Sequence, residues 1–270
     1  MPDSTAKPFL IWAGGKRLLL SQHNEYFPSV FKTYYEPFIG SGAVFFFLQP
    51  KKAVLSDTNE SLIKTYVAIK SNWKPVFSHL RIHHKNHSKE YYYRIRGQKP
   101  RGPYSAAARF IYLNRTCWNG LYRVNLKGYF NVPIGTKTSV LLPGDDFETI
   151  SSILQSVELK KCDFERVIDQ AGDGDLVYID PPYTINHSNN GFIKYNDVLF
   201  SWQDQLRLKD AAVRAVSRGA KVVISNAYHR TIEDLYKSSF ELNVLTRFSR
   251  ISGKNDGRKK GKEFLIRGGF

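Results

Sequence analysis

Four short apolar runs constrain the fold of this chain more than any other feature. Each ends at once in a glycine turn, a carboxylate or a polar pair, and together they cover residues 34–38, 53–57, 176–180 and 221–226. Runs of this length are typical of strands buried on both faces of a parallel sheet. The segments at 43–48 and 202–218 have the apolar pattern of helices. This alternation predicts an α/β fold, with a mixed, mainly parallel sheet and helices on both faces.

The stretch from residue 61 to 155 has a different texture. It is rich in tyrosine, arginine, lysine and histidine and lacks a regular alternation of strands and helices. We therefore expect an inserted, mainly helical, basic domain at 61–155. The sheet domain would consist of residues 1–60 and 156–270.

Composition narrows the class of protein. Among 270 residues, 42% are hydrophobic and 14% aromatic, which is enough for a real core and excludes a disordered tail. The formal charge of +16 indicates an acidic partner, with nucleic acid the commonest candidate and a merely solubilising surface the alternative. The two cysteines form no CxxC pair, and no apolar run is long enough to span a bilayer. We expect an intracellular, cytoplasmic protein, associated with the nucleoid if the source is bacterial.

A glycine turn and an acidic residue follow the first two expected strands. Gly40-Ser41-Gly42 comes after the first strand and Asp57 ends the second. Ligands of doubly wound sheets bind beyond the carboxyl ends of the strands, where a carboxylate can accept hydrogen bonds from ribose hydroxyls. This pair alone fits NAD as well as S-adenosylmethionine, and many such turns bind nothing. Phe45 stands where the dinucleotide fingerprint has its third glycine, which favours a donor without phosphates.

The tetrapeptide Asp180-Pro181-Pro182-Tyr183 directly after the third run is the most specific chemical signal. An adenine N6 amine is a poor nucleophile because its lone pair is delocalised into the ring. The Asp180 carboxylate and the Pro181 carbonyl can accept its two hydrogens and stabilise the positive charge that grows on nitrogen during transfer. Two consecutive prolines fix that carbonyl, and Tyr183 offers a flat face to a flipped-out base. The alternative is a rigid turn capped by aspartate.

Five blocks in this order resemble the Dam-like DNA adenine-N6 methyltransferases, an alpha-type family with GATC-directed members. The blocks are residues 7–16, 36–42, 114–125, 128–135 and 180–183, and the likeness covers nearly the whole chain. The resemblance implies a Rossmann-like methyltransferase sheet with an inserted target-recognition domain. It also implies S-adenosylmethionine as methyl donor, no metal, and double-stranded DNA as partner of a monomer or of a weak dimer on DNA.

The resemblance further implies roles for single residues. In-line methyl transfer would be catalysed by Asp180, Pro181, Pro182 and Tyr183. The donor would be bound by Trp12, Lys16, Phe38, Gly40, Asp57, Phe164 and Asp180. The DNA would be recognised by Arg115, Trp118, Asn119, Leu121, Arg123, Pro133 and Lys137.

Within that recognition set, Trp118 matches a wedge that enters the base stack and Asn119 a residue beside the vacated position. Leu121, Arg123 and Pro133 match positions that read the outer bases of GATC, and an arginine fork fits guanine O6 and N7. Other roles stay open: a core position for Trp118, a phosphate contact for Arg123, and a scaffold or phosphate contact for Arg115.

Two departures from the family concern the first guanine of GATC. Ile11 replaces a basic residue of the first motif, and Thr136-Lys137 replace a frequent tyrosine. Lys137 is a candidate to compensate.

Weaker signals complete the sequence-based picture. Residues 254–262 form a basic, glycine-interrupted loop, a phosphate contact or a solvated segment. His83, His84 and His87 lack partner acids or cysteines at metal-ligand spacing, so we expect surface positions for them. Methylation of RNA and silent DNA binding remain the alternative functions. Marking a genome alone and protecting it within a restriction-modification pair fit the sequence equally.

Overall fold

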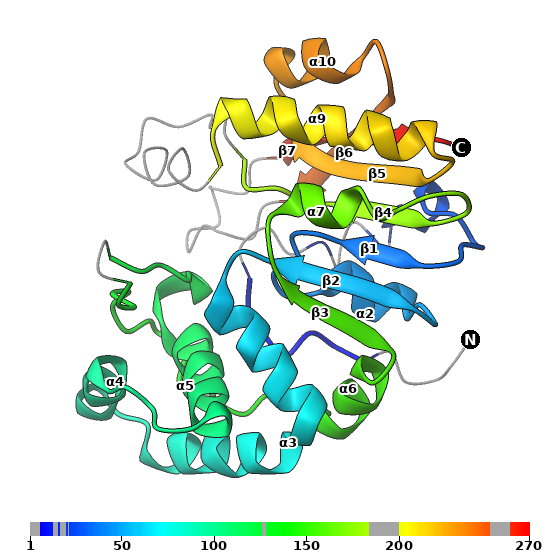
Figure 1. Ribbon diagram of the computed structural model, residues 1–270. Coiled ribbons are helices and arrows are strands. Elements are labelled where there is room, and N and C mark those ends of the chain that lie inside the picture. The colour runs from blue at the N-terminus through cyan, green and yellow to red at the C-terminus, as the bar shows by residue number, and fades with distance from the viewer. Residues whose placement is uncertain are drawn as a thin grey trace. The chain divides into compact units, whose positions relative to one another are not determined.

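The structure is a computed structural model that describes residues 6–12, 16, 20, 22–125, 128–183, 200–248 and 260–270 (Figure 1). The chain divides into two compact units. The first unit contains residues 1–21, 40–51 and 57–161, and the second contains residues 22–39, 52–56 and 162–270.

The second unit is built on the sheet. Its strands are β1 (Tyr34–Glu36), β2 (Ala53–Asp57), β4 (Leu176–Ile179), β5 (Lys221–Ala227), β6 (Glu241–Phe248) and β7 (Lys260–Gly268). The order is β2-β1-β4-β5-β7-β6. Strands β2, β1, β4 and β5 run parallel, whereas β7 is antiparallel to both β5 and β6. All four apolar runs are therefore strands, and the expected mixed sheet is confirmed.

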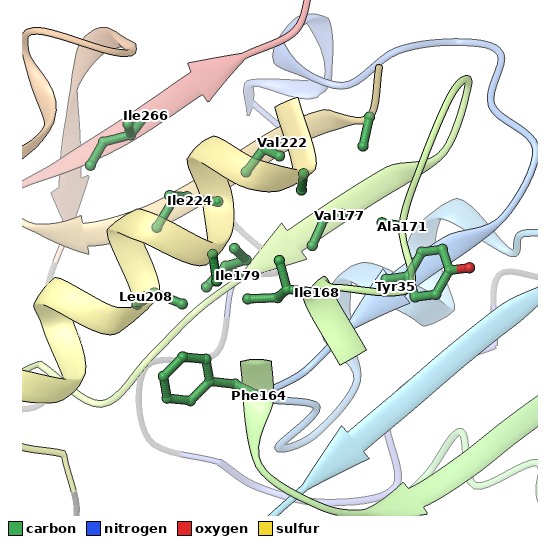
Figure 2. Close-up of a cluster of buried hydrophobic side chains, with 14 of the residues drawn as sticks. Tyr35, Phe164, Ile168, Ala171, Val177, Ile179, Leu208, Val222, Ile224 and Ile266 are labelled. Carbon is green, nitrogen blue, oxygen red and sulfur yellow. The ribbon is translucent and has the colours of Figure 1, made fainter. Parts of the chain in front are cut away.

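Both faces of this sheet are covered within the second unit. Its helices are η1 (Asn24–Tyr26), α7 (Phe164–Ile168), α9 (Trp202–Ser217) and α10 (Arg230–Tyr236). Figure 2 shows Ile168 of α7 and Leu208 of α9 gathered with Ile179 and Ile224 of the sheet in one buried cluster. On the other face, Phe27 packs against Tyr178 with 5.8 Å between ring centroids. Strands covered on both sides read as continuous apolar runs, which explains their clear sequence signal.

The first unit is mainly helical. It contains α2 (Ala43–Leu48), α3 (Glu60–Asn86), α4 (Lys89–Gly97), α5 (Pro103–Thr116), η2 (Trp118–Gly120) and α6 (Phe147–Leu154), together with β3 (Val157–Lys161), the remaining strand of the sheet. Helix α3 packs against α5 and α6. It is interrupted at Asn72, whose φ of −162° is not helical, three residues before Pro75. Pro75 has no N–H, and its ring would clash in a regular helix with the carbonyl of Ser71 four residues earlier, so the helical hydrogen bonding is broken beside Asn72.

Two of the three histidines expected on the surface are partly buried instead. The His83 ring stacks on Tyr112 at 4.8 Å, and its Nδ1 lies 2.7 Å from the Tyr91 hydroxyl. Burial lowers the pKa of His83 to about 4, because the charged imidazolium is disfavoured away from water. His87 is half-buried and contacts the Tyr112 hydroxyl through Nδ1 at 3.0 Å. Among the described residues, no group of three or more His, Cys, Asp or Glu side chains is arranged to hold a metal ion.

Strands β3 and β6 were not predicted from the sequence. Strand β3 has a single fully buried residue, Val157, and β6 mixes polar and apolar residues at the end of the sheet order. Such strands lack the continuous apolar run that identified the others. No described helix is both long enough and apolar enough to cross a membrane.

Candidate active site and DNA interface

The glycine turn and Asp57 meet within the first unit. Gly40 has φ +46°, and its N–H donates to Asp57 Oδ2 at 3.4 Å. The other carboxylate oxygen, Oδ1, accepts the N–H of Asn59 at 2.9 Å. Burial raises the pKa of Asp57 to about 6, although these backbone N–H groups favour the charged form and pull in the other direction. The result is a half-buried carboxyl group directly after a strand, held by backbone N–H groups.

The first-motif residues Trp12 and Lys16 also belong to this unit. A Cβ built on Gly40 would lie 2.8 Å from Trp12 Cδ1, so glycine is required here both by the positive φ and by the indole ring. Lys16 is 4% exposed, which is rare for a lysine. Residues 13–15 of the same motif lie outside the described part of the chain.

Three aromatic rings cluster in the second unit. Phe38, after β1, stacks on Phe164 with 5.4 Å between ring centroids. Phe200, before α9, contacts Phe38 at 5.6 Å and Phe164 at 5.7 Å. The Arg207 guanidinium lies 4.9 Å from the centre of the Phe164 ring. Phe38 and Phe164 were expected from the sequence, whereas Phe200 was not, because it lies in no recognisable motif.

The tetrapeptide follows β4 at the carboxyl end of the parallel strands. Ile179 ends β4, and β4 is paired on both sides with parallel strands, β1 and β5. The Tyr183 hydroxyl donates to Glu263 Oε2 of β7 at 3.1 Å, and Glu263 is 4% exposed. This buried carboxylate holds one end of the tetrapeptide, and nothing in the local sequence around Glu263 predicted the contact.

Acidic groups surround the tyrosine that precedes the tetrapeptide in β4. Burial raises the pKa of Tyr178 well above its ordinary value, and the neighbouring charges of Asp180 and Glu36 raise it further. Glu36 in turn accepts the Tyr34 hydroxyl at 2.9 Å. The hydroxyls of Tyr34 and Tyr178 therefore remain protonated across the physiological pH range. The Asp180 side chain itself is only partly buried.

Residues 117–125 and 128–135 pair as an antiparallel hairpin in the first unit. Isolated bridges pair Val124 with Phe130 and Cys117 with Ile134. The Trp118 N–H donates to the Pro133 carbonyl at 3.0 Å. Helix α4 supports the returning arm, because the Tyr92 hydroxyl donates to the Val132 carbonyl at 2.9 Å. Residues 126–127 lie outside the described part of the chain.

This hairpin carries most of the residues expected to recognise DNA. Trp118 is 53% exposed, which is not the burial of a core tryptophan. Asn119 is exposed and has φ +54°, a left-handed conformation that asparagine tolerates better than most residues. Arg123 is half-buried, and its Nε donates to Asn131 Oδ1 at 2.9 Å. The remaining expected residues are half-buried or exposed: Leu121, Pro133 and Lys137.

Arg115 is different, and here the expectation of a DNA contact needs correction. Its side chain is fully buried. The two terminal nitrogens bind the Asp145 carboxylate at 2.6 and 2.7 Å. Further hydrogen bonds of 2.7–3.0 Å go to the carbonyls of Phe9 and Val140. All three guanidinium nitrogens are thus used inside the first unit, so Arg115 is a scaffold residue.

The chain was compared with protein families and curated proteins. Residues 12–251 match the model of the D12 class of N6 adenine-specific DNA methyltransferases. A relative from Lactococcus lactis subsp. cremoris, named type II methyltransferase M1.LlaDCHI, is 37% identical, and the alignment covers 96% of this chain and 94% of the relative. Type II methyltransferase M.MjaIII of Methanocaldococcus jannaschii is 35% identical, with 96% and 98% covered. The DNA adenine methylase of Escherichia coli K12 is 31% identical, with 96% and 94% covered.

The family match spans the glycine turn, the hairpin and the tetrapeptide, and the relatives align over nearly their whole lengths. This family and the mixed α/β sheet imply S-adenosylmethionine as the methyl donor. The chain belongs to the D12 class of N6 adenine-specific DNA methyltransferases.

Proposed function

We propose that the protein transfers a methyl group from S-adenosylmethionine to N6 of an adenine flipped out of duplex DNA, in GATC or a close variant. The observation that carries this proposal is the tetrapeptide Asp180–Tyr183 at the carboxyl end of β4, with parallel strands on both sides. Substrates of such sheets bind beyond that edge. We further propose that the protein acts as a monomer and that residues 61–155 form the target-recognition domain.

The donor site would be built from residues already described. The half-buried Asp57 carboxylate suits the two ribose hydroxyls, and the positive φ of Gly40 keeps the turn open where a side chain would collide. Trp12 and Lys16 of the first motif, with Phe38 and Phe164, would complete the contacts. When bound, S-adenosylmethionine supplies a methyl group made electrophilic by its sulfonium.

The chain's own chemistry is hydrogen bonding at the amine. The Asp180 carboxylate and the Pro181 carbonyl accept hydrogen bonds from the two N6 hydrogens, which increases the electron density on nitrogen and stabilises its growing positive charge. When the N–C bond forms, S-adenosylhomocysteine would leave, and the one proton that N6 then loses would pass to the Asp180 carboxylate. Pro182 restricts the backbone of Pro181 and so fixes that carbonyl. Tyr183, anchored by Glu263, stacks on the extruded base. These four groups need no covalent intermediate.

Target reading would belong to the hairpin. Exposed Trp118 fills the space that the extruded adenine leaves, with Asn119 beside it. Arg123 reads an outer guanine, and its bond to Asn131 fixes the plane of the guanidinium for that contact. Leu121 and Pro133 would contact outer base pairs, and Lys137 would take the place of the basic residue that Ile11 replaces.

The test is methyl transfer from labelled S-adenosylmethionine to duplexes that contain GATC, each single-base variant of it, or GATC already methylated on both adenines. We expect transfer to GATC alone and none to the methylated duplex. Transfer that tolerates changes at the first base would keep the chemistry and assign the altered specificity to Ile11 and Lys137. Transfer to structured RNA, or no transfer at all, would overturn the proposal.

The same panel tests Arg123. Arg123→Ala should lower discrimination at one outer base by about 10-fold or more, because a bidentate contact to guanine contributes about 1–3 kcal/mol of base discrimination. If Arg123 instead contacts a phosphate, its loss would weaken binding to all duplexes by the same factor. An unchanged ranking of the duplex variants would therefore identify Arg123 as a phosphate contact.

A further inference from the structure

One fully buried polar residue of the hairpin region has no role in the function proposed above. Asn114 lies in the last turn of α5 and is 0% exposed. Its Oδ1 accepts the Ile11 N–H at 2.8 Å, and its Nδ2 donates to the Ile11 carbonyl at 2.7 Å. The same Nδ2 donates to the Gly120 carbonyl at 3.2 Å. One amide thus pairs with two segments that lie more than one hundred positions apart in the chain.

Each of these segments leads directly to a functional residue. Ile11 precedes Trp12, which lies against Gly40 of the glycine turn. Gly120 follows Trp118 and Asn119, the exposed residues at the start of the hairpin. Asn114 therefore joins the segment expected to contact the methyl donor to the turn expected to contact DNA.

Packing reinforces this connection at two points. Gly120 has φ +65°, and a Cβ placed on it would lie 2.6 Å from Ile11 Cγ2. The Trp12 ring is stacked on Tyr122 of the hairpin, with 6.1 Å between centroids and 19° between planes. A displacement of the donor segment would therefore displace the hairpin as well, through the contacts of Ile11 with Gly120 and of Trp12 with Tyr122.

Asparagine is well suited to this position. Pairing with both polar groups of Ile11 requires one acceptor and one donor on the same short side chain. Aspartate keeps the acceptor but loses the donors, and alanine leaves three backbone groups without their partner: the N–H and carbonyl of Ile11 and the buried carbonyl of Gly120. A buried polar group without a partner destabilises the arrangement that buries it.

We propose that Asn114 is a positioning residue that couples binding of the methyl donor to recognition of the target bases. It holds the donor segment and the DNA-reading turn in one arrangement, so that a ligand ordering either one favours binding at the other. Such coupling is reciprocal, because the two affinities must change by the same factor. The inference rests on the proposed function, since it needs Trp12 at the donor and Trp118 at the DNA.

The experiment measures the dissociation constant of S-adenosylhomocysteine by calorimetry, alone and with a saturating duplex that the wild type methylates. The ratio of the two constants is the coupling factor. We expect a factor of about 5 or more for the wild type, in the usual range for coupled sites. In Asn114→Asp and Asn114→Ala, the factor should fall toward one, and discrimination against single-base variants should fall with it.

Two variants keep the test specific. Tyr92→Phe removes the hydroxyl that supports the hairpin at Val132 but does not contact the donor segment. We expect it to weaken DNA binding while the coupling factor stays at the wild-type value. Tyr122→Leu removes the ring stacked on Trp12 and leaves Asn114 intact, so it interrupts the same connection if the Asn114 variants fail to fold.

The outcomes separate this inference from the function beneath it. Folded Asn114 and Tyr122 variants that keep the wild-type coupling factor would overturn the inference. So would a wild type that binds both ligands and methylates DNA without any coupling, and in that case the proposed function would stand. A wild type that neither binds the donor analogue nor methylates a duplex would overturn both.

Discussion

Burial and hydrogen bonding shift the pKa of the Asp57 carboxyl group in opposite directions. Burial raises the pKa of its carboxyl group to about 6, from an ordinary value of 3.8, while the backbone N–H groups of Asn59 and Gly40 favour the charged form. Because the folded pKa is raised, the contribution of Asp57 to the free energy of unfolding is largest below its ordinary pKa. That contribution is lost as the pH rises through about 6.

Donor binding should show the opposite dependence on pH. Ribose hydroxyls donate hydrogen bonds to a carboxylate, so S-adenosylmethionine and its analogues should bind the ionised form of Asp57. Affinity for S-adenosylhomocysteine should then fall below about pH 6, approaching about tenfold per pH unit. Calorimetry between pH 5 and about pH 8 measures this. Asp57→Asn should bind weakly at every pH and lose the dependence; the same slope in that variant would show that another group titrates.

Asp180 is expected to act in the transition state more than in binding. Asp180→Ala removes one of the two acceptors for the N6 hydrogens and should slow transfer by on the order of 10²–10³-fold or more. Binding of unmethylated duplex should survive. Single-turnover transfer and fluorescence anisotropy separate the two effects.

Two matched variants sharpen that measurement. Asp180→Asn keeps an uncharged acceptor and should have an intermediate rate. Tyr183→Phe keeps the ring but loses the bond to Glu263, so it should retain more activity than Asp180→Ala. An Asp180→Ala enzyme with the wild-type rate would refute the mechanism.

At the scale of elements, the ion pair of Arg115 and Asp145 connects α5, the first-motif segment and the loop before α6. The two side chains are 0% and 8% exposed, and the guanidinium also binds the Phe9 carbonyl. Removing one partner leaves a buried charge without its counterpart, which typically destabilises a protein by about 3–5 kcal/mol.

We therefore expect Arg115→Ala and Asp145→Asn each to lower the midpoint of chemical denaturation substantially. The exposed pair of Lys32 and Asp173 provides the control, since its side chains are 66% and 85% exposed. Lys32→Ala should leave the midpoint nearly unchanged. Equal effects at the two sites would mean that burial does not decide the contribution of the Arg115 pair.

At the scale of the whole molecule, the charge of +16 should govern affinity for DNA. Each phosphate neutralised by a lysine or arginine releases counterions and contributes about −0.9 to the slope of log affinity against log salt. Between 50 and 200 mM salt, about six contacts would lower the affinity by about 10³-fold. Anisotropy titrations with target and unrelated duplexes should give steep slopes for both. A flat dependence would show that the positive charge does not face the DNA.

Much of the fold could be predicted from the sequence because its signals are local. A run such as Leu176–Ile179 is buried on both faces wherever it lies in a parallel sheet, so its composition identifies it. The edge strand β6 and the weakly buried β3 carry no such signal, and only their pairing in the tertiary structure identifies them as strands.

The candidate site divides in the same way. Asp180–Tyr183 and Gly40–Gly42 are contiguous, and their chemistry can be read from neighbouring residues alone. The partners of buried polar side chains are chosen by segments that meet only after folding. The sequence determined the four parallel strands β1, β2, β4 and β5, the class of reaction and the residues at the ends of those strands. The tertiary structure decided three further points. Arg115 is a scaffold residue, the Glu263 carboxylate accepts a hydrogen bond from Tyr183, and the Asn114 amide hydrogen-bonds to the backbone of Ile11. The physical reason is that hydrogen bonding of a buried group depends on which distant backbone atoms reach it, and local sequence does not encode this.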